Sequence, residues 1–428
     1  MSAGGGLTGG ERRPMMPAVE LRLAVPLAIF AFTYFVFAVG NFPGLKLDRT
    51  GAALAGALLM VVTGSLSESQ ALAAIDFHTI LLLLGMMIIV ANLRVSGAFA
   101  LVARWLLKRA HSGYGLLAMT VLASGVLAAF FINDVVCLSL AGPLIEVARI
   151  LEIDAAPLLL ALATGSNIGS VATITGNPQN MIVAGYAGIG YSAFAIRLAP
   201  VALAGLLVDF AVIAWLYRSH LSHVRPREDH ELPAPPPEHR YHLIKSSIVA
   251  AAVLVLFAMG YPTHLVAMGG GAALLFTRRT LPQSIYAQID WTLLVMFAGL
   301  FIVVRGVETT GLLKDLVQAA GPERLKNVAV LSVVAAALSN LVSNVPAMLL
   351  FKPIYPQISQ GMSTGLVLAS ASTFAGNLTL LGSLANLIVV EQARREGIEI
   401  SFVEYLKVGL PVTIITLAID IAWMQFFR

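Results

Sequence analysis

Residues 164–183 read TGSNIGSVATITGNPQNMIV and lie inside a long apolar region of the 428-residue chain. The stretch holds three glycines, Pro178 and a run of amide and hydroxyl side chains: Ser166, Asn167, Ser170, Thr173, Thr175, Asn177, Gln179 and Asn180. Non-helical backbone at membrane depth is tolerated only where it is buried in protein or lines a wet cavity. Helices interrupted by Gly and Pro are also the best sequence marker of a transporter's binding site. The stretch therefore predicts a broken helix that lines a central site.

A second, weaker copy of this pattern occurs at residues 375–390, AGNLTLLGSLANLIVV. The loop GNPQN (176–180) aligns with GSLAN (382–386), so that Asn180 matches Asn386. One broken segment in each half predicts a duplicated permease with one shared site.

The composition indicates a polytopic membrane protein that resides in a lipid bilayer. The chain is 58% hydrophobic and 12% charged, with a mean hydropathy of +0.85, whereas soluble domains carry about 25% charged residues. The net charge of +4 comes from short loops, as membrane topology requires, and does not indicate a nucleic-acid partner. No Walker A, GxSxG or HExxH motif and no zinc-ligand spacing occurs. We therefore predict no enzyme activity, no metal centre and no cofactor.

A helix that rises 1.5 Å per residue needs about 20 apolar residues to cross a bilayer. The predicted spans are 21–40, 51–65, 77–93, 156–186 (broken), 192–217, 246–260, 263–278, 290–305, 364–392 (broken) and 404–427. Two further apolar stretches, 115–150 and 328–358, have polar middles, which read FIND (131–134) and SNLVSNVP (339–346). Their arms of roughly 15 residues are too short to cross comfortably, so we expect re-entrant hairpins whose tips reach the midplane.

The order of spans is the same in both halves. An odd number of crossings per half means that the halves must be inverted relative to each other. The predicted fold is an all-α polytopic membrane protein with two inverted repeats of five transmembrane helices, each with a re-entrant hairpin and a broken helix. The predicted organisation is a disordered tail (1–19), a first repeat (20–217), a cytoplasmic linker (218–245) and a second repeat (246–428). The distribution of Lys and Arg in loops places both termini outside the cell.

The hairpin tips hold the first candidates for chemistry, Asn133 and Asp134 in one half and Ser343 and Asn344 in the other. Helix ends at such tips bind ions or polar solutes through their dipoles and unpaired backbone groups. Asp134 is the candidate coupling residue, because an ionisable group at membrane depth is costly and marks function. It is a candidate carrier of a proton or of sodium. The alternative is a helix N-cap for Asp134 and helix capping for the amides.

Three other residues receive structural interpretations. Asp209 and Asp420 are intramembrane, and an ion pair or a capping role is the better interpretation for both. Cys137 lies one turn after Asp134, where a thiol near a metalloid site is conceivable, but a lone membrane cysteine is usually a small apolar packing residue.

The segments FFINDVVCLSLAGPLIEVARIL and LLLALATGSNIGSVATITGNPQNMIVA resemble the ArsB/NhaD permease family of the ion-transporter superfamily. The resemblance runs from about Ala53 to the C-terminus, and SNVPA (343–347) and GSLANL (382–387) support it. It is strongest for the branch of arsenite and silicic-acid efflux transporters. The loop GNPQN differs from the GDPPN-like loop expected of sodium–proton antiporters. The tips also lack the Ser-Asn-Thr of dicarboxylate relatives.

The resemblance implies a secondary transporter in the inner (plasma) membrane, with a midplane site for a small inorganic solute. It also implies a homodimer and, for some relatives, a cytoplasmic ATPase partner. Transferred residue by residue, the substrate-binding set is Asn133, Asp134, Gly176, Asn177, Asn180, Ser343, Asn344, Gly382, Ser383 and Asn386.

Two transport hypotheses follow. The first is proton-coupled efflux of a small metalloid hydroxide (arsenite, antimonite or silicic acid), because the tips are rich in amides and carry no Lys or Arg. The second is sodium- or proton-coupled transport of an inorganic or organic anion. A passive channel is a further alternative, since broken helices also line pores.

Overall fold

The structure is a computed structural model, and it describes residues 16–40, 46–109, 112–222, 239–276, 281–312, 315, 318 and 321–426. The first half contains α1 (Met16–Val39), α2 (Arg49–Val62), α3 (Glu68–Ala74), α4 (Phe77–Val95), α5 (Ala98–Arg109), α6 (Gly113–Phe130), α7 (Asn133–Ile150), α8 (Ala156–Ser170), η1 (Ile174–Gly176), α9 (Pro178–Ala187), α10 (Tyr191–Leu216) and α11 (Arg218–Leu221). The second half contains α12 (His239–Ala258), α13 (Thr263–Leu275), α14 (Pro282–Tyr286), α15 (Trp291–Glu308), α17 (Pro322–Leu325), α18 (Val328–Val342), α19 (Asn344–Phe351), α20 (Tyr355–Ile358), α21 (Met362–Ala375), η2 (Leu380–Gly382), α22 (Leu384–Arg395) and α23 (Phe402–Phe426).

The helices confirm the all-helical polytopic membrane class. Among the described residues, α4, α6, α10, α12, α15 and α23 are long and apolar enough to cross a membrane. The predicted tail lies outside the described residues up to residue 15, and α1 begins at Met16. The middle of the predicted linker, 223–238, is also outside them, and α12 begins at His239, earlier than expected. Both arms of the first hairpin have 18 residues, longer than the predicted arms of about 15, and α6 is long enough to cross. The predicted arm length is therefore wrong for this hairpin and does not support its re-entry, which stays a prediction.

Both broken helices form as the Gly, Pro and polar residues predict. In the first half, α8 ends at Ser170, one 3₁₀ turn follows, and α9 restarts at Pro178 behind the N-cap Asn177. Proline suits a first helical position, because its missing N–H would be unpaired there anyway. In the second half, Ser383 is the N-cap of α22.

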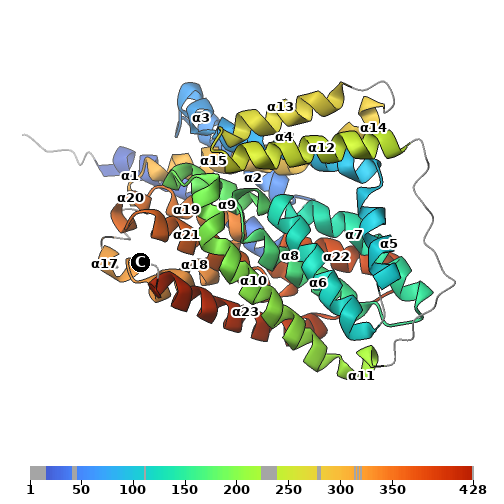
Figure 1. Cartoon of the computed structure of the whole chain (residues 1–428). Coiled ribbons are helices and arrows are strands. Elements are labelled where there is room, and N and C mark those ends of the chain that lie inside the picture. The colour runs from blue at the N-terminus through green and yellow to red at the C-terminus, as the bar shows by residue number, and fades with distance from the viewer. Residues whose placement is uncertain are drawn as a thin grey trace, which may run out of the picture.

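The broken helices lie in the middle of the molecule. In Figure 1, α4, α12 and α13 lie along one edge, α10 and α23 run along the opposite edge, and α8, α9, α21 and α22 lie between them. α2 packs on α15 and α4 packs on α13, so that each pair joins the two halves of the chain. α10 and α23 also pack on each other. The central segments are thereby enclosed by helices from both halves.

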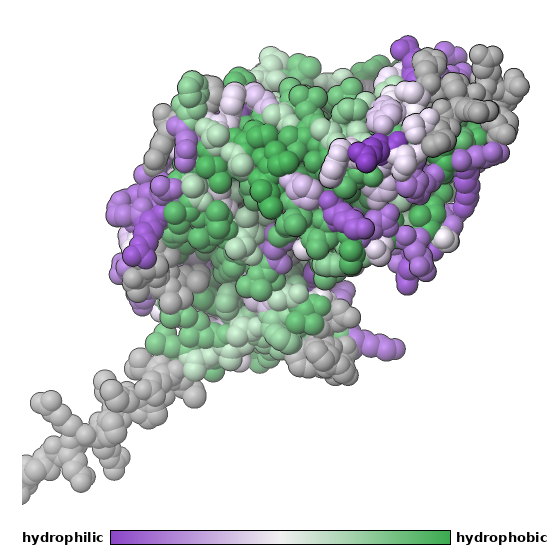
Figure 2. Space-filling model, turned by 90° about the horizontal axis from the view of Figure 1, so that it is seen from below, coloured by the Kyte–Doolittle hydropathy of each residue, from purple (hydrophilic) through white to green (hydrophobic). Residues whose placement is uncertain are grey.

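The outer surface is apolar over a wide area. Figure 2 shows broad hydrophobic patches on the face seen from below, with polar residues gathered toward the ends. On α10, Leu203 and Leu207 are 57% and 71% exposed, and on α23 Ile414 is 58% exposed. A soluble monomer rarely exposes so large an apolar area, so this surface fits a bilayer.

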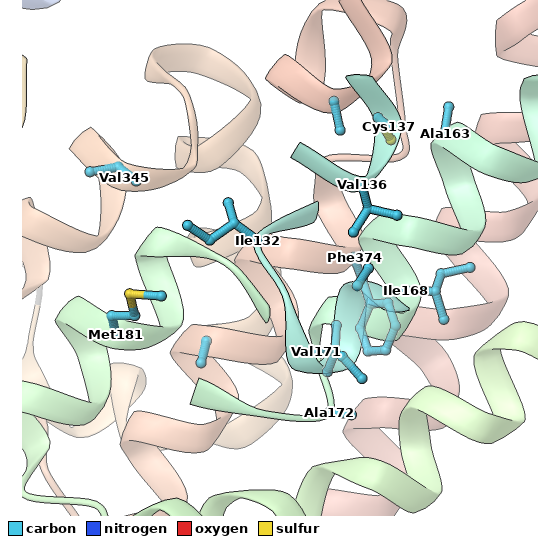
Figure 3. Close-up of a cluster of buried hydrophobic side chains, with 14 of the residues drawn as sticks. Ile132, Val136, Cys137, Ala163, Ile168, Val171, Ala172, Met181, Val345 and Phe374 are labelled. Carbon is cyan, nitrogen blue, oxygen red and sulfur yellow. The ribbon is translucent and has the colours of Figure 1, made fainter. Parts of the chain in front are cut away.

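An apolar core lies directly behind the hairpin tips. Ile132, Val136 and Cys137 of the first hairpin pack with Ile168 and Phe374 of the two broken helices (Figure 3). Cys137 is buried, and its Sγ lies 3.0 Å from the Ser166 hydroxyl. This core fixes the tips relative to the breaks, because close-packed interiors leave little room for displacement.

Candidate functional site

A cavity of about 220 Å³ lies where the two hairpin tips meet the ends of α2, α15, α9 and α22. Its polar lining residues are Arg49, Thr50, Asn133, Asp134, Gln179, Asp290, Thr292, Ser343, Asn344 and Ser383. Phe37, Met296 and Phe297 supply apolar walls. A water molecule occupies about 30 Å³ in the liquid, so the cavity has room for a small hydrated solute. Both halves of the chain contribute to this one site.

The first tip presents one amide and one carboxyl to the cavity. The Asn133 side chain is 4% exposed and donates from Nδ2 to Asn167 Oδ1 at 2.8 Å, while its own Oδ1 has no partner among the described residues. Asp134 is half-buried and interacts with the backbone N–H of Ala385 at the start of α22. A helix N-terminus favours negative charge, so α22 of the second half stabilises a charge on the first tip.

The second tip differs in backbone and in charge. Ser343 has φ 75° and ψ 158°, in a region that is essentially restricted to glycine. The next residue, Asn344, accepts a hydrogen bond at Oδ1 from Ser339. The Tyr34 hydroxyl of α1 donates to the carbonyl of Pro346 at 3.1 Å and ties this tip to the first helix of the chain. The surrounding contacts therefore hold a strained tip in place.

Asn167 is the centre of an amide network that joins the two halves. Its Nδ2 donates to Asn377 Oδ1 at 2.8 Å and to Asn386 Oδ1 at 2.9 Å. Its Oδ1 accepts from Asn133 and from the Ser383 hydroxyl, the latter at 3.0 Å. Asn167 is 1% exposed, so each unmade bond here would carry a desolvation cost. The network fixes two of the cavity side chains, Asn133 and Ser383, in orientation.

Asn180 and Asn386 form the same hydrogen bonds across the two breaks. Asn180 Nδ2 donates to the carbonyls of Ser170 and Thr173 at 2.9 and 2.8 Å. Asn386 Nδ2 donates to the carbonyls of Gly376 and Thr379 at 2.8 and 3.2 Å, which are the equivalent positions. These amides satisfy backbone groups that the interruption leaves unpaired.

Half of the predicted binding set therefore lines the cavity and half lies behind it. Asn133, Asp134, Ser343, Asn344 and Ser383 line it. The residues behind it are Gly176, Asn177, Asn180, Gly382 and Asn386. The glycines are needed for close approach, since a Cβ on Gly176 would stand 2.2 Å from the Ser170 carbonyl oxygen. The binding role of the first group stays a prediction, and the second group has clear structural partners.

Arg49, Asp290, Thr292 and Gln179 also line the cavity and are not in the binding set that the sequence predicts. Arg49 opens α2, and its Nε has no partner among the described residues. Asp290 caps α15 by accepting from Leu293 N at 3.0 Å, and it lines the cavity together with Asp134. The absence of cations holds for the tips but not for the cavity.

A second cavity, of about 420 Å³, lies at the N-terminal ends of α4 and α13. Asp76 caps α4 as Asp290 caps α15, and Thr263 opens α13 as Arg49 opens α2. Lys352, at the end of α19, is also in its wall. The two cavities are thus built from equivalent helix ends of opposite halves.

Comparison with known proteins identifies the family. Residues 32–375 match the family CitMHS, described as "Citrate transporter". The chain belongs to the CitMHS family. It is a membrane transporter of the ion-transporter superfamily and not an enzyme. The predicted superfamily is confirmed. The family model that matches is CitMHS, and the predicted assignment to the arsenite and silicic-acid branch of the ArsB/NhaD family stays a prediction.

Several relatives are similar over almost their whole length. A "46 kDa membrane protein" of Mycobacterium leprae is 31% identical, with 94% of this chain and 99% of the relative covered. The "Silicon efflux transporter LSI3" of Oryza sativa subsp. japonica is 30% identical, with 89% and 93% covered. The crystal structure of the YdaH transporter of Alcanivorax borkumensis superposes with a TM-score of 0.60 at 14% identity, covering 96% of this chain and 98% of that one. That likeness shows a shared fold.

Proposed function

We propose that this CitMHS transporter exports a small metalloid hydroxide, such as arsenite, antimonite or silicic acid, in exchange for protons. The observation that carries the proposal is the cavity in which Asn133, Ser343, Asn344 and Ser383 surround the single tip carboxyl, Asp134. Amide and hydroxyl groups both donate and accept, which suits a neutral polyhydroxylated solute. A relative of 30% identity that is named for silicon efflux supports this substrate class.

The architecture that we propose for this transport is a pair of inverted repeats with two re-entrant hairpins. The equivalent bonding of Asn180 and Asn386 supports the duplication. The two cavities at equivalent helix ends then form the mouths of one pathway, and the 220 Å³ cavity is on the cytoplasmic side. Proton and solute bias the two states only through their different affinities for each. Residence in the inner membrane, a homodimer and an ATPase partner remain predictions.

Asp134 carries the coupling proton in this proposal. It follows Asn133, which bonds to Asn167 of the amide network, and Asp290 lines the same cavity. Two carboxyls at one site repel when both are ionised, which favours a proton on one of them. Protonation of Asp134 and binding of the solute therefore compete at the same site.

One observation favours anion transport as a second candidate. The guanidinium of Arg49 lines the cavity, and its Nε lacks a partner among the described residues. Arg is the side chain best suited to bidentate recognition of a carboxylate. The printed description of the family, "Citrate transporter", points to the same chemistry. Citrate is therefore the anion to test first.

The test uses purified protein in liposomes with an imposed pH gradient. Wild-type protein is expected to accumulate arsenite on the acidic side, and Asp134→Asn is expected to lose gradient-driven accumulation while retaining arsenite exchange without a gradient. The matched control is Asp154→Asn, because Asp154 is exposed and caps α8 by accepting from Ala156 N. Gradient-driven accumulation at the wild-type level in Asp134→Asn would refute the coupling role.

The second arm separates the two substrate classes. If citrate is the substrate, Arg49→Gln lowers citrate transport at least about tenfold, since a lost charge-assisted hydrogen bond costs about 1.5–3 kcal/mol. If a neutral hydroxide is the substrate, the same variant leaves arsenite transport near wild type. Wild-type protein that moves citrate and no arsenite would decide for the second candidate.

A further inference from the structure

Two carboxyls lie outside both cavities, one on the last long helix of each half. Asp209 of α10 and Asp420 of α23 are both 0% exposed. Each faces the first segment of its half's broken helix. A Cβ on Gly165 of α8 would stand 3.4 Å from Asp209 Oδ2, and the Ser370 hydroxyl of α21 lies 2.7 Å from Asp420 Oδ2. Each half therefore has one buried carboxyl beside its broken helix.

Neither carboxyl has a cation partner. The ion pairs between described residues involve other acids, and the ion pair expected for the two aspartates from the sequence does not occur among them. Both oxygens of Asp209 and Oδ1 of Asp420 also lack a hydrogen-bond partner. A buried, unpaired carboxylate in a membrane protein is among the costliest groups to hold in its charged form.

One shared hydroxyl is the side-chain contact of the Asp420 carboxyl. The Ser370 Oγ lies 2.7 Å from Asp420 Oδ2 and 2.9 Å from the carbonyl oxygen of Leu366. A serine hydroxyl has only one proton to donate, so it cannot bond to both oxygens fully at once. A single shared donor is too little to compensate a buried carboxylate, which favours the protonated acid.

We propose that Asp209 and Asp420 remain protonated throughout the transport cycle, and that Asp420 acts as a positioning residue through its hydrogen bond with the Ser370 hydroxyl of the second broken helix. This deepens the proposed function and rests on it, because it leaves the coupling proton to Asp134. The titratable group that faces Asp209 from a neighbouring helix is Tyr405 of α23. In the described chain, Ser370 is the side chain that contacts the carboxyl of Asp420.

The positioned segments lead directly to the site. Asn167, the centre of the amide network, lies one helical turn after Thr164. Thr373 lies one turn after Ser370, and its hydroxyl accepts from Gln179 Nε2 at 3.2 Å in the cavity wall. The bond between Ser370 and Asp420 therefore sets how far the second broken helix is advanced relative to α23.

Infrared spectroscopy of the purified protein tests the protonation without any substrate. Difference spectra of wild type against D209N and against D420N at neutral pH are expected to show the carbonyl band of a protonated carboxylic acid, lost in each variant. Difference spectra that contain only carboxylate bands would overturn the proposal. Because no transport is measured, that result is separate from a failure of the proposed function.

Transport by the same variants tests the positioning role. D209N and D420N keep a neutral donor of the same shape, so both are expected to retain gradient-driven accumulation. D420A removes the bond to Ser370 and leaves a void, with an expected loss of about tenfold, whereas D209A leaves only a void and should lose less. S370A combined with D420A should cost little more than D420A alone, because the two residues form one contact. Loss of gradient-driven accumulation in D209N or D420N, with exchange intact, would instead make them coupling acids and overturn the proposal.

If the alanine variants do not fold, transport by the asparagine variants and the infrared bands still test whether the two aspartates are protonated. Folding is checked by the elution of each purified variant as a single species. A D209N protein that folds and transports, without the acid band of the wild type, supports the proposal by itself.

Discussion

The two hairpin tips occupy equivalent places and carry different chemistry. Asn133 and Asn344 correspond, but Asp134 follows the first and Val345 follows the second. The backbone conformation is strained only at the tip that lacks the carboxyl: Ile132 has an unstrained φ of −57°, whereas Ser343 has φ 75°. The first tip contributes charge and the second contributes strain. The two tips thus lie in equivalent places of the site but contribute different properties to it.

The two breaks, in contrast, have kept the same bonds. Asn180 and Asn386 each donate to two carbonyls at equivalent positions. The first break is nevertheless more tightly enclosed, since all residues from 171 to 184 are buried, whereas Leu381 of the second is 61% exposed. The same substitution at equivalent positions of the two halves should therefore have unequal effects. The ranking of these effects tests the comparison.

The largest difference is expected between Gly176→Ala and Gly382→Ala. A Cβ on Gly176 would lie 2.2 Å from the Ser170 carbonyl oxygen, and one on Gly382 would lie 2.8 Å from the Gly376 carbonyl oxygen. Overpacking costs about 1–3 kcal/mol and more where backbone is struck. Gly176→Ala should abolish folded protein, and Gly382→Ala should fold with a lowered Tm. Equal yields and equal Tm values in detergent would contradict the unequal enclosure.

The next effect is expected at Asn167, which joins the halves. Asn167→Leu removes the amide that bonds Asn377 and Asn386 and leaves both oxygens buried without their donor. A buried group without its partner costs about 1–3 kcal/mol. The variant should lower the Tm and transport together. Asn92→Leu is the matched control, because Asn92 is equally buried but donates only to Ile88 O of its own helix.

Much of this architecture could be predicted from sequence, because its signals are local. Apolar length, Gly and Pro interruptions and the polar tips located the helices to within a few residues, apart from the earlier start of α12. The direction of the amides could not be predicted, since Asn180 and Asn133 look alike in sequence and only packing turns one to the backbone and one to the cavity. Arg49 and Asp290 were missed because only the tertiary contact of α2 with α15 brings them to the tips.

Moving the carboxyl from one tip to the other is the next test of the comparison. Val345 is 8% exposed and lines the cavity, so the double variant Asp134→Asn/Val345→Asp places the acid on the second tip. If coupling requires only an acid at one of the two tips, gradient-driven accumulation should return in part. If coupling depends on the N-terminus of α22 beside Asp134, it should stay absent. Flux measured in liposomes against the single variant Asp134→Asn distinguishes the two results.

The smallest expected effect is at Ser343, and its sign is opposite to the others. Ser343→Gly relieves a backbone conformation that costs a non-glycine residue about 1–3 kcal/mol, and the greater freedom of glycine in the unfolded chain offsets about 0.5–1 kcal/mol of the gain. The Tm should therefore rise slightly. The transport rate should fall, because the variant loses a cavity hydroxyl and frees a tip that Tyr34 holds through Pro346. Ile132→Gly at the unstrained tip should lower the Tm, because it removes a side chain that is 0% exposed and gains no relief. A fall in Tm for both variants would mean that the backbone conformation of Ser343 does not destabilise the fold.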